Sequence, residues 1–273
     1  MKGPLLLAGC GKMGGAMLEG WLERGLSPTG VFIVDPGPAA SALNDQFGVT
    51  VVSSPDDLPD DLVPTVVIYA VKPQMMDAVA PAYARFNGPD TVFLSIAAGK
   101  TIAYFENHIG SPAAPAAIVR AMPNTPAAVR RGITVACPNS HVSDVQKQFS
   151  DDLLQAVGEV EWVEDEGMID AVTALSGGGP AYVFLLTECM AQAGLDAGLP
   201  EDLANKLARV TVSGAGELMR QSPEDPATLR KNVTSPAGTT AEALAVLMAD
   251  DAWQPLMTKA IAAATARSKE LAG

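Results

Sequence analysis

The chain has 273 residues, of which 48% are hydrophobic and 18% charged, which is the balance of a folded protein with one large domain or two moderate ones. Its formal net charge of −13 repels polyanions, so nucleic acid is excluded as an expected partner. Cys10, Cys137 and Cys189 are widely separated, and His108 and His141 lack metal-ligand spacing, which excludes a disulfide framework and a histidine-based zinc site.

Short apolar or β-branched runs alternate with helical patterns through the first half of the chain, at residues 5–8, 31–34, 66–70, 92–96 and 118–121. This alternation predicts a parallel sheet covered by helices. Between the first two runs, apolar residues recur at helical spacing, which predicts a βαβ unit: Met13, Ala16, Met17 and Trp21. Further strands are predicted at 132–136 and 159–163, with an amphipathic helix at about 143–156 between them.

The apolar run at residues 4–9 is much shorter than the core of a signal peptide or a membrane span. We therefore expect no targeting segment, no membrane association and a cytoplasmic location. The scattered, odd-numbered cysteines fit the same reducing compartment.

A glycine-rich loop follows the first predicted strand and opens the first predicted helix. Its sequence at 9–14, G-C-G-K-M-G, has the G-x-G-x-x-G spacing, which permits a tight turn, a close approach to a pyrophosphate and close packing of helix on strand. The helix amino terminus then presents free N–H groups and a partial positive charge to the phosphates. The alternative is a glycine-rich turn with no ligand. The predicted dinucleotide contacts are Gly9, Gly11, Lys12, Met13 and Gly14.

Asp35 ends the second predicted strand, 21 residues after Gly14. An acid at this place can hydrogen-bond the ribose hydroxyls of NAD and repels an added phosphate. No Lys or Arg occurs between Arg24 and Lys72, so the stretch also lacks the guanidinium that usually accompanies a 2′-phosphate. The sequence therefore favours NADH over NADPH, and the alternative is that Asp35 only caps the turn at 36–38.

The composition changes after Asp165, where Ala/Leu-rich helical patterns follow at 181–197, 201–221 and 251–271. We predict an α/β fold with a dinucleotide-binding domain at 1–164 and an all-helical domain at 165–273. The helices are too apolar around their circumference for an isolated bundle, since a helix that is apolar on most sides is normally buried. This favours a homodimer interface, and the alternative is a monomer whose helices pack on the sheet domain.

Three further loops follow predicted strands at the carboxyl edge, where open α/β sheets bind ligands. Two of them lie at 71–73 and 95–99, and Lys72 is either a cofactor contact or a surface charge. The third, at 122–126, has prolines on both sides of Asn124 that fix the backbone. A rigid turn there could hold a nicotinamide ring, and the alternative is a purely structural proline turn.

The segment at 235–242, S-P-A-G-T-T-A-E, leads into an apolar helical run and has the features of a helix amino terminus. Thr239 followed by Glu242 resembles a capping box. Gly238 permits close approach of the backbone to a ligand. Exposed N–H groups and the helix dipole there would suit a carboxylate, and the alternative is ordinary helix capping.

Six segments, in order, resemble pyrroline-5-carboxylate reductases and together span nearly the whole chain: 9–16, VKPQ at 71–74, SIAAG at 95–99, RAMPNTP at 120–126, LSGGGPAY at 175–182 and VTSPAGTT at 233–240. The resemblance implies an amino-terminal Rossmann-like domain and a helical carboxy-terminal domain that forms homodimers, sometimes rings of dimers. It also implies the last step of proline biosynthesis, in which NADPH or NADH transfers a hydride to the C=N bond of 1-pyrroline-5-carboxylate to give L-proline. Two small replacements bear on loop geometry, since Gly178 stands where the family commonly has Ser and Ala237 where it commonly has Gly.

The resemblance also implies roles for individual residues. The 235–240 loop holds the substrate through Ser235, Gly238, Thr239 and Thr240, with the Thr240 hydroxyl offered to the ring nitrogen. An iminium already carries its proton, so the protein mainly orients and polarises the substrate and excludes water, while the cofactor carries the difficult chemistry. The residues implied to line the cofactor in the carboxyl-edge loops are Val71, Lys72, Pro73, Ala97, Ala98, Met122, Pro123 and Asn124.

Three other interpretations fit the sequence less well. Ser176 precedes a run of glycines but has no usable histidine partner, so a turn at a helix start is a better interpretation than a nucleophile. β-Hydroxyacid dehydrogenases share the G-x-G-x-M-G start but rely on a lysine early in the second domain, and no lysine occurs between Lys147 and Lys206. A non-catalytic NAD-binding regulator would need neither the 122–126 turn nor the 235–240 loop.

Overall fold

The computed structural model describes residues 3–272, so Met1, Lys2 and Gly273, which belong to the predicted domain ranges, lie outside the described part. The chain divides into two compact units. The first holds the residues up to Gly177 together with those from Thr265 onwards, and the second holds residues 178–264. Helix α11 (Trp253–Ala272) contributes residues to both units.

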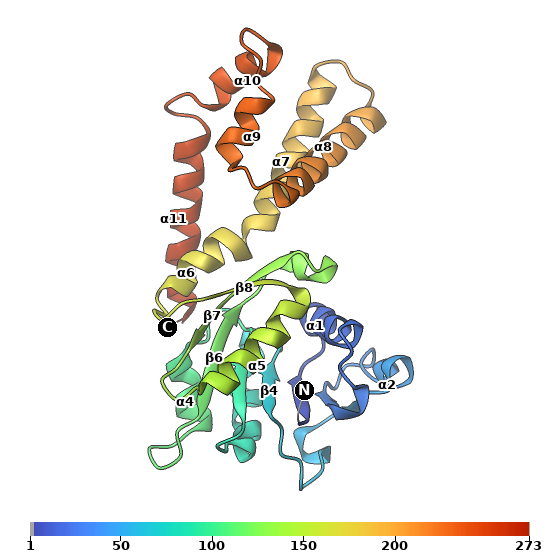
Figure 1. Ribbon diagram of the computed structural model, residues 1–273, viewed down its shortest axis with the longest axis vertical. Coiled ribbons are helices and arrows are strands. Elements are labelled where there is room, and N and C mark those ends of the chain that lie inside the picture. The colour runs from blue at the N-terminus through green and yellow to red at the C-terminus, as the bar shows by residue number, and fades with distance from the viewer. Residues whose placement is uncertain (1–2, 273) are drawn as a thin grey trace. The chain divides into compact units, whose positions relative to one another are not determined.

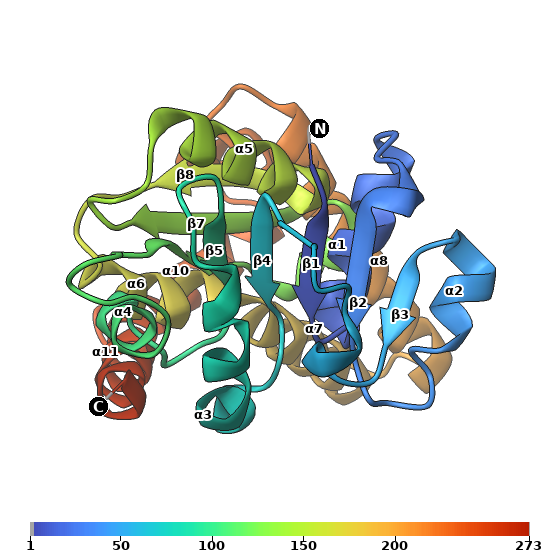
Figure 2. The same cartoon turned by 90° about the horizontal axis from the view of Figure 1, so that it is seen from below.

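An eight-stranded sheet forms the centre of the first unit (Figures 1 and 2), with the strand order β3-β2-β1-β4-β5-β6-β7-β8. Neighbouring strands from β3 to β6 pair in parallel, which confirms the predicted parallel sheet. Their order is that of doubly wound dinucleotide-binding folds. The strands are β1 (Leu5–Ala8), β2 (Val31–Val34), β3 (Thr50–Val52), β4 (Val66–Tyr69), β5 (Val92–Ser95), β6 (Ala117–Met122), β7 (Gly132–Pro138) and β8 (Gly158–Trp162).

The last two strands run against the others: β7 pairs antiparallel with β6, and β8 pairs parallel with β7. The link between β6 and β7 covers only residues 123–131, which is too short for the helical crossover that a parallel pair needs. Strand β3 has no counterpart among the predicted strands, because it is three residues long and only partly buried.

Each central strand is buried on both faces, which explains its unbroken apolar sequence. Leu5 and Leu7 of β1 face one core cluster, which includes Trp21 and Leu153, whereas Leu6 faces the other cluster. The indole Nε1 of Trp21 donates to the Leu153 carbonyl at 2.9 Å. The helices of this unit are α1 (Lys12–Glu23), α2 (Ala42–Phe47), α3 (Met76–Val79), α4 (Ile102–Ile109), α5 (Asp144–Leu154) and α6 (Met168–Val172), and α6 leads into a π-helical turn at Thr173–Gly177.

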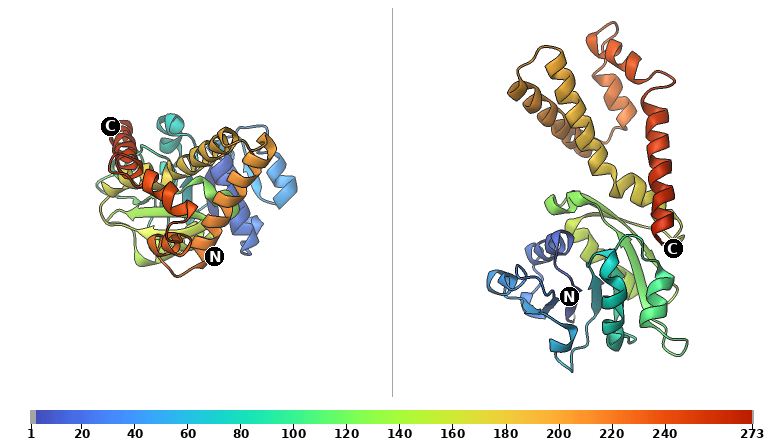
Figure 3. Two further views of the ribbon diagram at one scale, coloured as in Figure 1. Left: turned by 90° about the horizontal axis from the view of Figure 1, so that it is seen from above. Right: turned by 180° about the vertical axis from the view of Figure 1, so that it is seen from behind.

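The second unit is helical, and α7 packs beside α8 (Figure 3). The helices predicted at 181–197, 201–221 and 251–271 are confirmed as α7, α8 and α11, with ends shifted by at most two residues. Helix α9 has no counterpart among the predicted helices. The helices that make up this unit with part of α11 are α7 (Gly179–Asp196), α8 (Glu201–Gln221), α9 (Pro226–Asn232) and α10 (Thr239–Leu247).

The helical unit has little apolar core of its own. Its buried apolar side chains are the alanines Ala191, Ala204 and Ala208. Larger side chains remain open to solvent, such as Phe184 at 61% exposure and Val246 at 71%. Apolar helix faces of this kind are typical of an interaction surface.

One helical stretch among the described residues, Met168–Asp196, is long and apolar enough by length and composition alone to cross a membrane. It contains α6, the π-helical turn and α7. The same composition is typical of helices at a subunit interface.

Candidate functional site

The glycine-rich loop connects β1 to α1, and two of its glycines are required by close contacts. Gly9 has a φ of +88°, and a Cβ built there would lie 2.7 Å from Val71 Cγ1. A Cβ on Gly14 would lie 2.7 Å from the Gly9 carbonyl oxygen, so only glycine lets α1 start this close to β1. By contrast, no atom lies within 4 Å of a Cβ built on Gly11, which leaves space in front of the loop.

Helix α1 begins at Lys12 with Gly11 as its N-cap residue. No side chain of the described residues caps this end, and the first turn contains no acidic residue. The first backbone hydrogen bond of the helix runs from Gly15 N to Gly11 O at 2.8 Å. The first-turn amides, which include those of Lys12 and Met13, therefore form an uncapped positive end that suits an anion.

Asp35 follows β2 and connects two loops. Its Oδ2 accepts a hydrogen bond from the Cys10 amide at 2.7 Å, and its Oδ1 accepts one from the Gly37 amide at 2.8 Å. The carboxylate therefore holds the glycine-rich loop and also caps the turn that follows β2. The capping that the sequence left as an alternative does occur, and each oxygen keeps a lone pair for a further donor.

The thiol of Cys10 lies inside this loop and is half-buried. Burial, with a contribution from the charges of Asp35 and Glu19, raises the pKa of Cys10 to about 11. Only the thiolate is a good nucleophile, so this cysteine stays protonated and unreactive near neutral pH.

The carboxyl ends of four strands lie at one level. The register pairs Ala8 with both Val34 and Tyr69, and Tyr69 with Ser95. The loops that begin at Gly9, Asp35, Ala70 and Ile96 therefore leave the sheet together, at the edge where such sheets bind ligands.

The predicted cofactor residues of the β4 and β5 loops differ in accessibility. Val71 lies against the glycine-rich loop, since its Cγ1 is the nearest atom to a Cβ built on Gly9. Lys72 is exposed, Pro73 is partly buried in the turn that follows, and Ala98 is partly buried. Ala97 is buried, and its amide donates to Ser95 Oγ at 3.3 Å.

The turn after β6 is joined to a distant segment through Asn124. Its Oδ1 accepts a hydrogen bond from the Ile133 amide at 3.0 Å, and its Nδ2 donates to the carbonyl oxygen and the Oγ of Ser176, each at 3.3 Å. Ser176 lies in the π-helical turn, and the next residue, Gly177, lies against Met122, whose Cε is 2.8 Å from a Cβ built on Gly177. The structure thus brings the 120–126 and 175–182 motifs together. The hydrogen bonds of the Asn124 side chain go to other residues of the protein. Pro123 is buried beside them.

The 235–240 loop lies in the helical unit, between α9 and α10. The Gly238 amide donates to the Ser235 carbonyl at 3.0 Å, and Ala237 between them has a φ of +55°. Helix α10 starts at Thr239, with Gly238 as its N-cap residue and no side-chain cap among the described residues. The predicted capping box is therefore wrong. Gly238 occupies the N-cap position, so Thr239 is already the first helical residue and cannot cap the helix.

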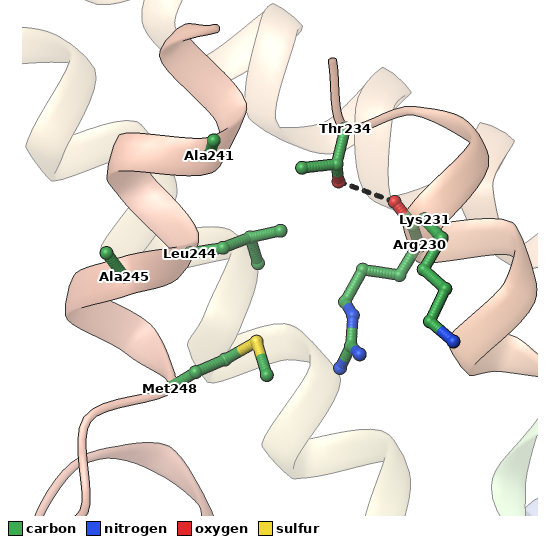
Figure 4. Close-up of a pocket in the computed structure, with 7 residues that line it drawn as sticks. All are labelled: Arg230, Lys231, Thr234, Ala241, Leu244, Ala245 and Met248. Carbon is green, nitrogen blue, oxygen red and sulfur yellow. Dashed lines mark hydrogen bonds between the residues drawn. The ribbon is translucent and has the colours of Figure 1, made fainter. Parts of the chain in front are cut away.

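The side chains of Thr239 and Thr240 are exposed, as is that of Ser235. An open groove of about 410 Å³ lies beside this loop, between α9 and α10 (Figure 4). It has an apolar floor, with two cationic side chains from α9. The residues that line it are Arg230, Lys231, Thr234, Ala241, Leu244, Ala245 and Met248, so Thr234 and Ala241 flank the loop on either side.

Arg120 and Glu166 lie near the predicted cofactor loops, and neither of them was predicted from the sequence to have a role in the site. Arg120 is 4% exposed in the middle of β6, and its Nη1 lies 2.6 Å from Glu166 Oε1. An arginine inside the apolar run A-I-V-R-A-M is a signal for a buried carboxylate partner. Sequence could not identify that partner, because Glu166 lies 46 residues further along the chain.

Comparison with known proteins first gives the class. Residues 5–99 match the family model described as NADP oxidoreductase, coenzyme F420-dependent. With the parallel sheet and the uncapped glycine-rich loop, this match makes the chain a nicotinamide-dependent oxidoreductase with a Rossmann-like domain.

Further matches identify the family. Residues 166–271 match the model described as pyrroline-5-carboxylate reductase dimerisation. The chain is 40% identical to pyrroline-5-carboxylate reductase of Pseudomonas aeruginosa, over 97% of this chain and 95% of the relative, and 36% identical to that of Escherichia coli, over 88% and 87%. It therefore belongs to the pyrroline-5-carboxylate reductase family, which confirms the resemblance read from the sequence.

Solved structures agree over the full length. The structure of a pyrroline-5-carboxylate reductase from Coxiella burnetii is similar with a TM-score of 0.92 and 32% identity, covering 100% of both chains. The Plasmodium falciparum pyrroline carboxylate reductase with NADP bound is similar with a TM-score of 0.82 and 28% identity, covering 100% of this chain and 99% of that one. The predicted fold class, with its helical dimerisation domain, is confirmed.

The positive φ of Ala237 generates a prediction about stability. A residue with a Cβ is strained in the left-handed region, so Ala237→Gly should raise the free energy of unfolding by about 1 kcal/mol. Urea unfolding at fixed protein concentration measures the change. The control is Ala243→Gly in the exposed interior of α10, which should lower the free energy by about the same amount. A loss of stability in both variants would contradict the prediction.

Proposed function

We propose that this chain reduces 1-pyrroline-5-carboxylate to L-proline with NADH or NADPH, the last step of proline biosynthesis. The observation that carries the proposal is the similarity, over nearly the whole chain, to relatives named pyrroline-5-carboxylate reductase. Helices α1 and α10 both start at a glycine N-cap residue with no side-chain cap among the described residues. The start of α1 supports cofactor binding, and the start of α10 supports substrate binding.

The residues around the glycine-rich loop fit a dinucleotide. A pyrophosphate needs open space, unpaired amides and no negative side chain at the helix start, and the Gly11 and α1 geometry meets all three needs. When bound, the nicotinamide ring supplies the hydride for the reduction. In this proposal the chain holds the cofactor through Gly9, Gly11, Lys12, Met13, Gly14, Asp35, Val71, Lys72, Pro73, Ala97, Ala98, Met122, Pro123 and Asn124.

Asn124 has a specific place within this proposal. Its carboxamide is already bonded to Ile133 and Ser176, so its contribution to the cofactor site falls to its backbone and to the shape of the turn. The neighbouring prolines keep that shape because they restrict the φ angles around Asn124.

The proposed preference is for NADH. The carboxylate of Asp35 is held at a fixed place by the Cys10 and Gly37 amides. From there it can accept hydrogen bonds from the ribose hydroxyls of NADH, and its charge repels the 2′-phosphate of NADPH. The absence of Lys and Arg between Arg24 and Lys72 supports the same preference.

The proposed substrate site is the start of α10. The carboxylate of the imino acid takes the place of a side-chain cap, facing the Thr239 and Thr240 amides with help from Ser235. Gly238, whose own amide donates to the Ser235 carbonyl, allows the close approach of the substrate to the backbone. The Thr240 hydroxyl is the proposed partner of the ring nitrogen. Since the substrate iminium already carries a proton, these groups orient and polarise the C=N bond and need not titrate.

The proposed assembly is a homodimer, alone or in a ring of dimers, in the cytoplasm. The exposed apolar side chains of the helical unit support it, because a second copy would remove them from water. The strongly acidic composition supports a protein without nucleic-acid partners, and we propose no membrane partner.

The division into domains at 164/165 stays a prediction. The dimerisation model begins at residue 166, whereas the compact units divide at 177/178. We propose that residues 165–177, which lie between these two division points, belong functionally with the helical domain, because α6 and the π-helical turn lead along the chain into α7.

A direct assay tests the proposed function. Purified protein is mixed with 1-pyrroline-5-carboxylate and either NADH or NADPH, and the loss of reduced-nicotinamide absorbance is followed. We expect turnover with both coenzymes, with the larger kcat/KM for NADH, and proline as the product by amino-acid analysis. No turnover with either coenzyme would refute the proposal.

Substitution of Asp35 tests the coenzyme preference. Asp35→Ser removes the repulsion of the 2′-phosphate, so the ratio of kcat/KM for NADPH to that for NADH should rise by about tenfold. Asp35→Asn, which removes the charge but keeps the shape, should shift the ratio in the same direction. Asp45→Ser, which removes an exposed charge from α2, is the control and should leave the ratio unchanged. An unchanged ratio in both Asp35 variants would contradict the preference.

Substitution of Thr240 tests the substrate site. Thr240→Ala should lower kcat at least about tenfold, because the ring nitrogen loses its hydroxyl partner. The dissociation constant for NADH, measured by fluorescence, should not change. Thr240→Ser should restore turnover, and Thr258→Ala, which removes an exposed hydroxyl from α11, is the matched control. Full turnover in Thr240→Ala would remove this hydroxyl from the mechanism.

A further inference from the structure

Arg120 is a guanidinium buried in the middle of the sheet. It lies on β6, where the register pairs it with Ser95 of β5 and Cys137 of β7. Its side chain is 4% exposed, and a cation so far from water is costly unless a carboxylate neutralises it. Glu166 provides that carboxylate, with Arg120 Nη1 at 2.6 Å from its Oε1.

The same oxygen has a second donor. Glu166 Oε1 accepts the amide hydrogen of Ile102 at 2.8 Å, and Ile102 is the first residue of α4. A carboxylate at this place also faces the positive end of the helix dipole. One oxygen atom therefore connects the start of α4, the middle of β6 and the segment that precedes α6.

Each connected point adjoins a loop already described. Ile102 closely follows the SIAAG loop at 95–99, and Arg120 lies two residues before Met122 and its turn. Glu166 leads through α6 into the π-helical turn, whose Ser176 accepts a hydrogen bond from Asn124. These contacts form a closed ring within the first unit: Glu166 to β6, β6 to Asn124, Asn124 to Ser176, and Ser176 back through α6.

We infer that Glu166 is a positioning residue for coenzyme binding, which holds the 95–99 and 122–126 loops in place through Arg120 and the start of α4. The inference rests on the proposed function, since it takes these loops to line the cofactor. Glu166 acts through other residues and touches no reacting atom. Its effect should therefore fall on the affinity for the coenzyme and not on the affinity for the imino acid.

The test replaces Glu166 and measures coenzyme binding directly. In Glu166→Gln the charge that holds Arg120 is lost, and the dissociation constant for NADH, measured by fluorescence, should rise about tenfold, as expected for one charge-assisted hydrogen bond. The KM for 1-pyrroline-5-carboxylate at saturating coenzyme should stay within about twofold of the original value. Glu164→Gln makes the same chemical change on an exposed side chain two residues away and should change neither constant.

Two further variants separate positioning from stability. Leu154→Ala destabilises the core on the other face of the sheet, and at an equal loss of thermal stability it should leave the dissociation constant unchanged. The double variant Arg120→Met/Glu166→Gln leaves no unpaired buried charge, so it should fold even if the single variant does not, and it should still bind NADH about tenfold more weakly. Unaltered NADH binding in the folded Glu166 variants, or equal weakening in Leu154→Ala, would overturn the inference.

The binding measurement also keeps the two proposals apart. It needs no imino acid, so it reports on Glu166 whether or not the wild-type protein reduces 1-pyrroline-5-carboxylate. A wild-type protein that binds NADH but does not turn over the imine refutes the proposed substrate alone. If the wild-type protein is fully active and its Glu166 variants bind NADH as tightly as it does, the positioning role alone is refuted.

Discussion

The candidate cofactor site depends on the hydrogen bond from the Cys10 amide to the Asp35 carboxylate, which holds the glycine-rich loop in place. This hydrogen bond joins the loop after β1 to the loop after β2, at 2.7 Å. With the Cys10 amide held there, the chain has only Gly11 in which to turn before α1 begins. The direction of α1, and hence of its free amides, follows from this contact together with the close approach of Gly14 to the Gly9 carbonyl.

Sequence predicted the features whose causes are local. A strand that is buried on both faces must be apolar throughout, and the runs at 5–8, 66–70 and 92–96 are therefore visible without a structure. The glycine-rich loop is visible for a similar reason, because Gly9 and Gly14 are required by close contacts and Gly11 leaves the space that a ligand needs. Strand β3 was not predicted because it has three residues, one exposed and two partly buried, which give neither the length nor the burial pattern of a recognisable strand.

The errors and omissions have causes that are distant in the chain or depend on backbone angles. The capping box at Thr239 and Glu242 fits the residue types, but Ala237 takes a positive φ and Gly238 becomes the N-cap residue, so the helix starts one residue earlier than a capping threonine requires. Contacts such as Asn124 with Ser176 join residues 52 apart. No local pattern encodes such a pair. A charged residue in an apolar strand, such as Arg120, does indicate that a partner of opposite charge exists.

The two candidate binding loops share one more property, which shows when their helix starts are compared with others in the chain. Within residues 3–272, the N-cap residues of α1, α4, α5, α9 and α10 all have the extended conformation that side-chain capping uses. Thr101, Ser143 and Asp225 cap α4, α5 and α9 through their side chains, whereas α1 and α10 have Gly11 and Gly238 at this position.

A side-chain cap typically stabilises a helix by about 1 kcal/mol relative to alanine and by only about a few tenths of a kcal/mol relative to glycine, and it occupies the amides that an external anion would use. Glycine keeps the backbone geometry and leaves those amides open, at the expense of the stability that a cap provides. In the proposed function, a pyrophosphate and an imino-acid carboxylate each supply the missing acceptor. Ligand binding should then stabilise the same two helix starts that the sequence leaves uncapped, because the interaction that folding omits there is completed by the ligand.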